Sequence, residues 1–267
     1  MDLGISGKRA LVLGGSKGIG LAVARQLARE GCSVAIVARG EAAISQAVRE
    51  LEHFGGAVQG IVEDLTDIGC YARIIGTLKE GAGAPDIVVF LPPNPCHGSF
   101  LERTEDDFAA AFHEQVLCLG RMVRECLPHM QAKSWGRFVI VGSGSTKEPM
   151  RGQLGFDYAL TNVTRMAALR LCKQIALEVA PFGITINTIA TGSIDTELFQ
   201  NFFTERAREA GVPADEFIGN IIAKVPARRM GTPDEMAGLC LYLCSDIAGY
   251  TTGENILCDG GLINTPM

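Results

Sequence analysis

The chain of 267 residues lacks several features that would place it in common classes of protein. No stretch approaches the roughly 20 consecutive apolar residues of a membrane-spanning helix. The N-terminus has no basic flank followed by a long apolar run and a small-residue cleavage site. Lysine and arginine number 24 against 30 acidic residues, so the net charge of -6 does not favour nucleic acid or an anionic membrane as a partner. We expect a cytoplasmic protein that acts on small molecules.

Cysteine and histidine lack the spacing of ligand sets. The nine cysteines are an odd number and include no C-x-x-C pair, which argues against a disulfide framework and against a structural zinc site. The four histidines fall in no metal-ligand spacing. We therefore expect no metal, and we interpret the cysteines as reduced, small apolar residues.

What the sequence contains is a series of short runs rich in Val and Ile, separated by longer segments with helical periodicity. Each run is nearly continuous in apolar residues and flanked by turn residues, as expected of strands buried on both faces. The runs are 9–13, 33–37, 57–62, 86–91, 137–141, 184–189 and 255–258. This alternation predicts an α/β domain with a doubly wound, seven-stranded parallel sheet. No repeat or linker divides residues 1–267, so we expect a single domain.

Residues from about 195 to 230 contain no strand pattern. The segment carries Phe199, Phe202, Phe203 and Phe217. It is interpreted as a helical insertion that covers a substrate site as a lid; the alternative is that these phenylalanines belong to the core.

A glycine-rich turn, "GGSKGIG", follows the first predicted strand and opens a helix. Small residues let the backbone approach a pyrophosphate closely, and free N–H groups at a helix start attract its charge. In this position, the pattern predicts a dinucleotide site. The predicted cofactor-binding residues of the turn are Gly14, Ser16, Lys17, Gly18, Ile19 and Gly20.

The residue after the second strand contacts the adenosine ribose in such sites. Here that residue is Arg39, and Lys17 is a second nearby cation. Two cations suit a 2′-phosphate, so NADP(H) is favoured over NAD(H), although Arg39 could also be a solvated surface charge. After the third strand, Asp64 is placed to accept a hydrogen bond from the adenine amino group, with Leu65 beside it.

Motifs along nearly the whole chain resemble those of the short-chain dehydrogenase/reductase family. Besides the glycine turn and "DLTD" at 64–67, they are "LPHM" at 127–130, "GRFVIVGS" at 136–143, "APFGITINTIA" at 180–190, "RRMGTPDEMA" at 228–237 and "CDGG" at 258–261. The resemblance implies a Rossmann-type fold and a homotetramer. The chain also looks like a divergent branch of this family that is often labelled 3-oxoacyl-carrier-protein reductase-like.

In this family a tyrosine exchanges a proton with the substrate, a lysine four residues later binds the nicotinamide ribose, and an asparagine one helix earlier holds a water chain to that lysine. The resemblance places the tyrosine at Tyr158, but the lysine position is Asn162 and the asparagine position is Gln115. An amide still bonds ribose hydroxyls but supplies no positive charge. We expect Asn162 to hold the ribose and Tyr158 to keep its role.

Three further positions follow from the resemblance. The family serine that orients the carbonyl falls on Ser143 by strand position and on Ser145 by spacing to the tyrosine, and we favour Ser143. Ile194 and Thr196 match the segment that holds the nicotinamide carboxamide.

A cation that could replace the missing lysine is Arg165. It shares a helix face with Tyr158 and Asn162. The alternative for Arg165 is a surface or subunit-interface cation.

The leading functional hypothesis is an NADPH-dependent carbonyl reductase that transfers hydride to a ketone of a fairly apolar small-molecule or acyl substrate, with Tyr158 as proton donor. Loss of the lysine motivates an alternative: an NADP(H)-binding homologue with weak or no redox activity that acts as a sensor or as the partner subunit of an active relative. A third hypothesis is a non-redox reaction such as dehydration or isomerisation. The dinucleotide turn counts against it, because a non-redox site has less need of a dinucleotide.

Overall fold

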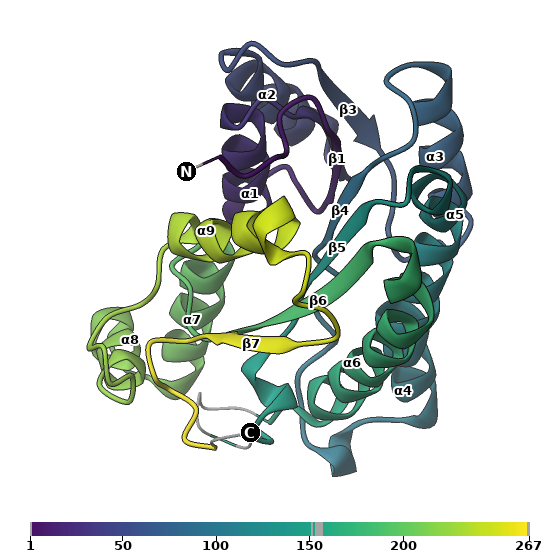
Figure 1. Ribbon diagram of the computed structural model, residues 1–267. Coiled ribbons are helices and arrows are strands. Elements are labelled where there is room, and N and C mark those ends of the chain that lie inside the picture. The colour runs from purple at the N-terminus through teal and green to yellow at the C-terminus, as the bar shows by residue number, and fades with distance from the viewer. Residues whose placement is uncertain (1, 151, 153–156, 266–267) are drawn as a thin grey trace.

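The computed structural model describes residues 2–150, 152 and 157–265, and a seven-stranded parallel sheet forms its centre (Figure 1). The strand order is β3-β2-β1-β4-β5-β6-β7. The bounds are β1 Arg9–Leu13, β2 Ser33–Ala38, β3 Val58–Val62, β4 Ile87–Phe90, β5 Gly136–Val141, β6 Ile184–Thr191 and β7 Asn255–Cys258. All seven predicted strands are confirmed. Because the order reverses between β1 and β4, the carboxyl ends of these two strands open the crevice in which doubly wound sheets bind ligands.

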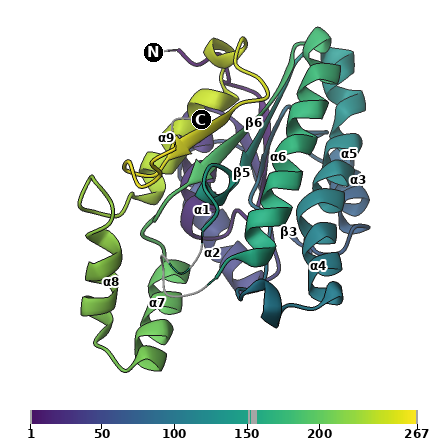
Figure 2. The same cartoon turned by 90° about the horizontal axis from the view of Figure 1, so that it is seen from below.

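Helices cover both faces of the sheet (Figure 2). On one face lie α1 (Gly18–Arg29), α2 (Glu41–Glu52) and α9 (Pro233–Cys244), and on the other lie α3 (Cys70–Glu80), α5 (Cys118–Lys133) and α6 (Ala159–Val179). Apolar residues from the strands pack against each layer in two separate clusters. The continuous Val and Ile runs are therefore explained by burial on both sides.

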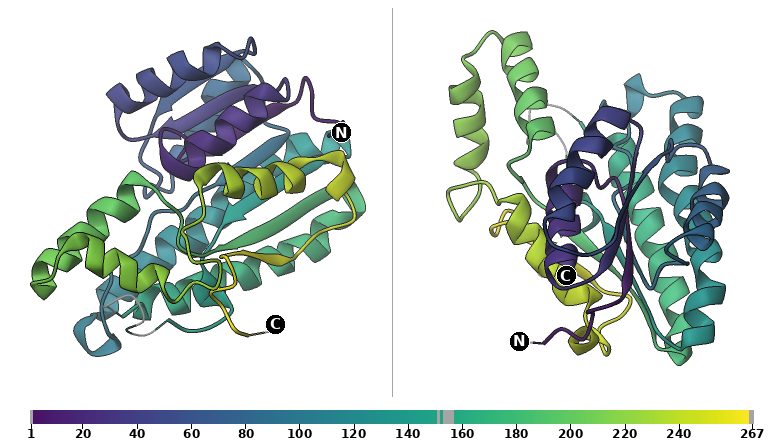
Figure 3. Two further views of the ribbon diagram at one scale, coloured as in Figure 1. Left: turned by 90° about the vertical axis from the view of Figure 1, so that its left-hand side faces the viewer. Right: turned by 90° about the horizontal axis from the view of Figure 1, so that it is seen from above.

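Helices α7 (Glu197–Ala210) and α8 (Ala214–Ile222) lie side by side and stand away from the sheet (Figure 3). Both fall within the segment in which the sequence predicts a helical insertion. Phe203 and Ile221 are buried between the two helices, and Phe199, Phe202, Phe217, Ile218 and Tyr158 pack against them. The phenylalanines thus form a small cluster of their own that reaches Tyr158.

Helix α4 (Glu105–Phe112) runs into α5 through one π-helical turn, His113–Leu117. Such turns are rare and occur often at functional sites. This one carries Gln115, whose side chain is buried. The extra residue of the turn therefore lies at the position that the family resemblance assigns to the catalytic machinery.

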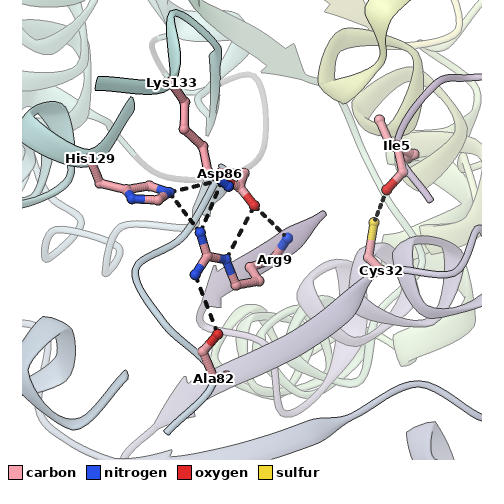
Figure 4. Close-up of polar contacts among 7 residues, drawn as sticks. All are labelled: Ile5, Arg9, Cys32, Ala82, Asp86, His129 and Lys133. Atoms are coloured by element: carbon pink, nitrogen blue, oxygen red, sulfur yellow. Dashed lines mark hydrogen bonds and ion pairs between the residues drawn. The ribbon is translucent and has the colours of Figure 1, made fainter. Parts of the chain in front are cut away.

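At the amino end of the sheet, a buried carboxylate collects three basic side chains (Figure 4). Asp86 accepts hydrogen bonds from Lys133 at 2.7 Å, from His129 at 2.9 Å and from the Arg9 backbone N–H at 2.9 Å, and it also pairs with the Arg9 guanidinium. Burial alone would raise the pKa of a carboxyl, but these bonds outweigh it and hold the pKa of Asp86 well below its usual range. The cluster ties β1, β4 and α5 together, at the opposite end of the sheet from the glycine turn.

No helix in the described ranges is long and apolar enough to cross a membrane. Those same ranges hold no group of three or more His, Cys, Asp or Glu side chains arranged to bind a metal.

Candidate active site

The glycine turn lies at the carboxyl end of β1, where the chain reverses into α1. Gly14 and Gly18 have φ of 90° and 55°, in the left-handed region that favours glycine. A Cβ on Gly20 would overlap the carbonyl oxygen of Gly14, so only glycine allows the helix start to pack this closely against the turn. Helix α1 begins with backbone N–H groups that have no partner within the helix, and these suit an anionic pyrophosphate. The turn has the features that a dinucleotide requires.

The segment after β6 lies next to the glycine turn. Ile194 is buried and forms a bridge with Gly231, while the Thr196 hydroxyl accepts from the Phe199 N–H at 3.2 Å and caps α7. A Cβ built on Gly18 would lie 3.4 Å from the Thr196 methyl group. The glycine turn and Thr196, 178 residues apart in the sequence, are therefore neighbours.

Arg39, which follows β2, and Asp64, which follows β3, are both exposed. The backbone N–H of Thr66 is the largest cause of a lowered pKa for Asp64, and the charge of Arg39 lowers that pKa further. Arg39 therefore lies near Asp64 across β2 and β3, while Leu65 is buried beneath them. This arrangement agrees with a ribose and adenine site at these residues.

Tyr158 immediately precedes α6 and is fixed by the loop that follows β4. The Gly98 N–H donates to the Asp157 carbonyl at 2.9 Å, and the Ala159 N–H donates to the Gly98 carbonyl at 3.2 Å. Burial raises the pKa of Tyr158 well above its ordinary value near 10. The phenol is therefore neutral at physiological pH, the form in which it donates a proton.

Asn162 lies one helical turn after Tyr158. Its Oδ1 accepts from the Met150 N–H at 3.1 Å, and its Nδ2 donates to the Met150 carbonyl at 2.9 Å. The amide thus ties α6 to Met150, which lies between β5 and α6. One hydrogen and one lone pair remain for a further bond, so these contacts leave Asn162 able to bond a ribose hydroxyl.

The two candidate serines differ in burial. Ser143 follows β5, is half-buried, and its Oγ accepts from the Ser145 N–H at 3.2 Å. Ser145 is only 3% exposed. Ser143 is therefore the more accessible hydroxyl.

Arg165 lies inside the protein, contrary to one expectation from the sequence. The alternative of a surface cation is wrong, because its side chain is only 6% exposed. Its Nη1 donates to the Val141 carbonyl at 2.9 Å, and its Nη2 donates to Asn94 Oδ1 at 3.2 Å. Arg165 thus joins α6 to the carboxyl end of β5 and to the loop after β4.

The same loop is held from the other side by Gln115, whose Nε2 donates to the Pro93 carbonyl at 2.5 Å. Gln115 is 1% exposed. The structure therefore brings Gln115 and Arg165 to adjoining residues of one loop beside Tyr158.

His97 is a site neighbour that the sequence analysis missed. Its ring lies edge-on to Tyr158, with centroids 5.1 Å apart, and 4.9 Å from the ring of Phe202 on α7. Burial, and secondarily the charge of Arg206, lower the pKa of His97, which favours a neutral imidazole. No residue spacing signals this contact, because it depends on the path of the loop after β4.

Known proteins with this arrangement are oxidoreductases. A family model described as "Enoyl-(Acyl carrier protein) reductase" matches residues 14–263. "Dehydrogenase/reductase SDR family member 4" of Oryctolagus cuniculus is 33% identical over 96% of this chain and 94% of its own length. D-beta-hydroxybutyrate dehydrogenase of Rhizobium meliloti (strain 1021) is 29% identical over 95% of this chain and 98% of its own length.

Solved structures agree. L-sorbose reductase from Gluconobacter frateurii, complexed with NADPH and L-sorbose, has a TM-score of 0.92 and 28% identity, covering 99% of this chain and 100% of that chain. The chain belongs to the short-chain dehydrogenase/reductase family. It is an oxidoreductase that uses a nicotinamide cofactor and acts on a small molecule.

Proposed function

We propose that the chain is an NADPH-dependent carbonyl reductase in which Tyr158 protonates the oxygen of a ketone. The observation that carries the proposal is the raised pKa of the half-buried Tyr158, which the loop after β4 holds in place at the start of α6. A neutral phenol is already the acid that reduction needs, whereas oxidation needs the phenolate. The raised pKa thus favours reduction as the working direction.

The remaining residues take roles around this proton transfer. The glycine turn binds the pyrophosphate, and bound NADPH supplies the hydride. Ser143 orients the carbonyl oxygen, with Ser145 as the second candidate, and Asn162 bonds the nicotinamide ribose. Ile194 and Thr196 hold the carboxamide.

The preference for NADPH rests on charge. Arg39 and Lys17 are both exposed, and a 2′-phosphate is proposed to lie beside them. The structures of L-sorbose reductase and of actinorhodin polyketide ketoreductase, the second with a TM-score of 0.89 and 26% identity, each contain NADPH. These likenesses support the same cofactor here.

The substrate is proposed to be a fairly apolar ketone. The aromatic cluster of α7 and α8 reaches Tyr158, and the His97 ring contacts both Tyr158 and Phe202. Residues 195–230 would then close over the substrate as a lid and exclude water.

The test is turnover of a ketone panel by purified protein with NADPH, compared with Tyr158→Phe. We expect wild-type protein to consume NADPH with at least one ketone, and the variant to lose at least about 100-fold in kcat while binding NADPH equally well. An equally active variant would refute the role of Tyr158.

One observation favours the second candidate, a nucleotide-binding homologue without redox activity. Position 162 is an asparagine rather than the lysine of the family, and both its Oδ1 and its Nδ2 already bond Met150. Thermal stabilisation by NADPH without turnover of any ketone would support this sensor or partner-subunit role.

We also propose a homotetramer, as in the family resemblance. Val163, Met166 and Leu177 of α6 are exposed by 55%, 38% and 67%, an apolar content that suits a helix at a subunit interface. Size-exclusion chromatography with light scattering tests this assembly, and a monomer would contradict it.

A further inference from the structure

Several buried polar atoms have no hydrogen-bond partner among residues 2–150, 152 and 157–265, and two of them belong to Arg165 and Gln115. One is Nε of Arg165, a donor, and the other is Oε1 of Gln115, an acceptor. The remaining nitrogens of both side chains are bonded, to Val141, Asn94 and Pro93. A native interior rarely leaves such groups unpaired, so each calls for a partner.

Both side chains line one small cavity under the carboxyl ends of β5 and β6. Its other walls include Pro92, Gly142 and Thr188. The volume open to the centre of a water molecule is about 10 Å³, close to the space that a single water occupies. Buried waters bind where polar groups of complementary kind converge, and here a donor and an acceptor do so.

The charge of Arg165 gives a second reason for a polar occupant. Burial lowers the pKa of Arg165 to about 10, so the guanidinium stays protonated at neutral pH. No described carboxylate forms an ion pair with it, and its two bonded nitrogens have neutral acceptors. A water that accepts from Nε would solvate a buried cation that otherwise has little compensation.

We infer that this cavity binds one ordered water, which accepts from Arg165 Nε–H and donates to Gln115 Oε1. Through this water and its bond to Asn94, Arg165 is a positioning residue for the loop from Leu91 to Gly98. Pro92, Pro93 and Pro95 remove three backbone donors from that loop, so side chains must hold it.

The loop matters because Gly98 forms backbone hydrogen bonds with Asp157 and Ala159, the residues on either side of Tyr158. A loop that moves would displace the proton donor relative to the substrate, and small displacements cost rate steeply. This role rests on the proposed reductase function, while the water site does not.

The water site is tested by a crystal structure of the full chain at about 1.5 Å resolution or better, at which buried waters are well defined. We expect density within hydrogen-bond distance of both Arg165 Nε and Gln115 Oε1. A cavity without that density, or one filled by a rearranged side chain, would overturn the water site.

The positioning role is tested with Arg165→Met, Gln115→Met and the double variant. Thr164→Val is the matched control, because Thr164 is equally buried on α6 but bonds only within its helix, to Leu160. We expect Arg165→Met to lower kcat about tenfold or more with less than about threefold change in KM, and Arg165→Lys to recover part of the loss.

The double variant should be no slower than the slower single variant, since both side chains act on one loop. Losses in kcat that multiply, or an equal loss in Thr164→Val, would overturn the positioning role. Should Arg165→Met fail to fold, Arg165→Lys and Gln115→Met give the same comparison. If wild-type protein turns over no ketone, the proposed function fails. The electron density of the water, together with a double-variant cycle in melting temperature, still tests whether the water connects Arg165 to Gln115.

Discussion

Replacing Asn162 by lysine should restore alcohol oxidation at neutral pH. Position 162 lies one turn of α6 after Tyr158, where the family resemblance expects a cation. A positive charge within about 4–6 Å lowers the pKa of a phenol by roughly 1–3 units. Each unit gives tenfold more phenolate at neutral pH, so we expect kcat/KM for the alcohol at pH 7 to rise at least about tenfold in Asn162→Lys.

Reduction of the ketone should change less than about threefold, because the neutral phenol is already its acid. The assay follows NADPH absorbance in both directions from pH 6 to 10. Wild-type oxidation should climb about tenfold per pH unit below the pKa of Tyr158, and the variant curve should be displaced to lower pH.

The matched control is Asn162→Met, which loses the same two bonds to Met150 but adds no charge. Two neutral hydrogen bonds contribute about 1 kcal/mol each, so both variants should melt several degrees lower. Equal oxidation rates for the lysine and methionine variants would refute the reasoning, because the charge would then have no effect on Tyr158.

Three further variants test the groove and the scaffold. Arg39→Ser should weaken NADPH about tenfold in fluorescence titration and leave NADH unchanged, since only NADPH carries the 2′-phosphate; equal effects on both would contradict the NADPH preference. Gly20→Ala should weaken both cofactors more than about tenfold because its Cβ meets the Gly14 carbonyl, whereas Gly238→Ala on α9, with open space around it, should not. Asp86→Asn should lower the free energy of unfolding by about 2–3 kcal/mol at pH 7, or the melting temperature by about 4–10 °C. This is less than for a fully buried ion pair, because the basic partners of Asp86 are partly exposed. The depressed pKa of Asp86 means that this stability is present above about pH 4 and declines below it, so a difference that persists unchanged at pH 2 would argue against the ion pairs.

The strands and the glycine turn were predictable because their signals are local. Runs such as 33–37 and 184–189 are continuous in apolar residues, and a strand buried on both faces requires this composition. The turn from Gly14 to Gly20 was likewise predictable, because its glycines themselves indicate where the backbone turns tightly. Local signals misplaced Asp86, which was predicted to lie inside the fourth strand but precedes it. Its position depends on hydrogen-bond partners 43 to 77 residues away in the sequence.

The polar surroundings of Tyr158 could not be predicted in the same way. Helical spacing placed Arg165 on the face of Tyr158, but its burial depends on Val141 and Asn94, which come from other elements. The pairing of Asn162 with Met150 and the approach of His97 depend on loop paths, for which the sequence carries no periodic signal. Roles inferred from residue types alone therefore needed the contacts of the fold.

In the proposed mechanism, a neutral Tyr158 delivers the proton that accompanies hydride transfer. Single-turnover measurement of NADPH oxidation, with a ketone identified from the panel, tests it most directly in wild-type protein and Tyr158→Phe. We predict equal dissociation constants for NADPH and a rate of hydride transfer that falls at least about 100-fold in the variant, with the wild-type rate nearly constant from pH 6 to 8. Equal rates in the two proteins would contradict the claim.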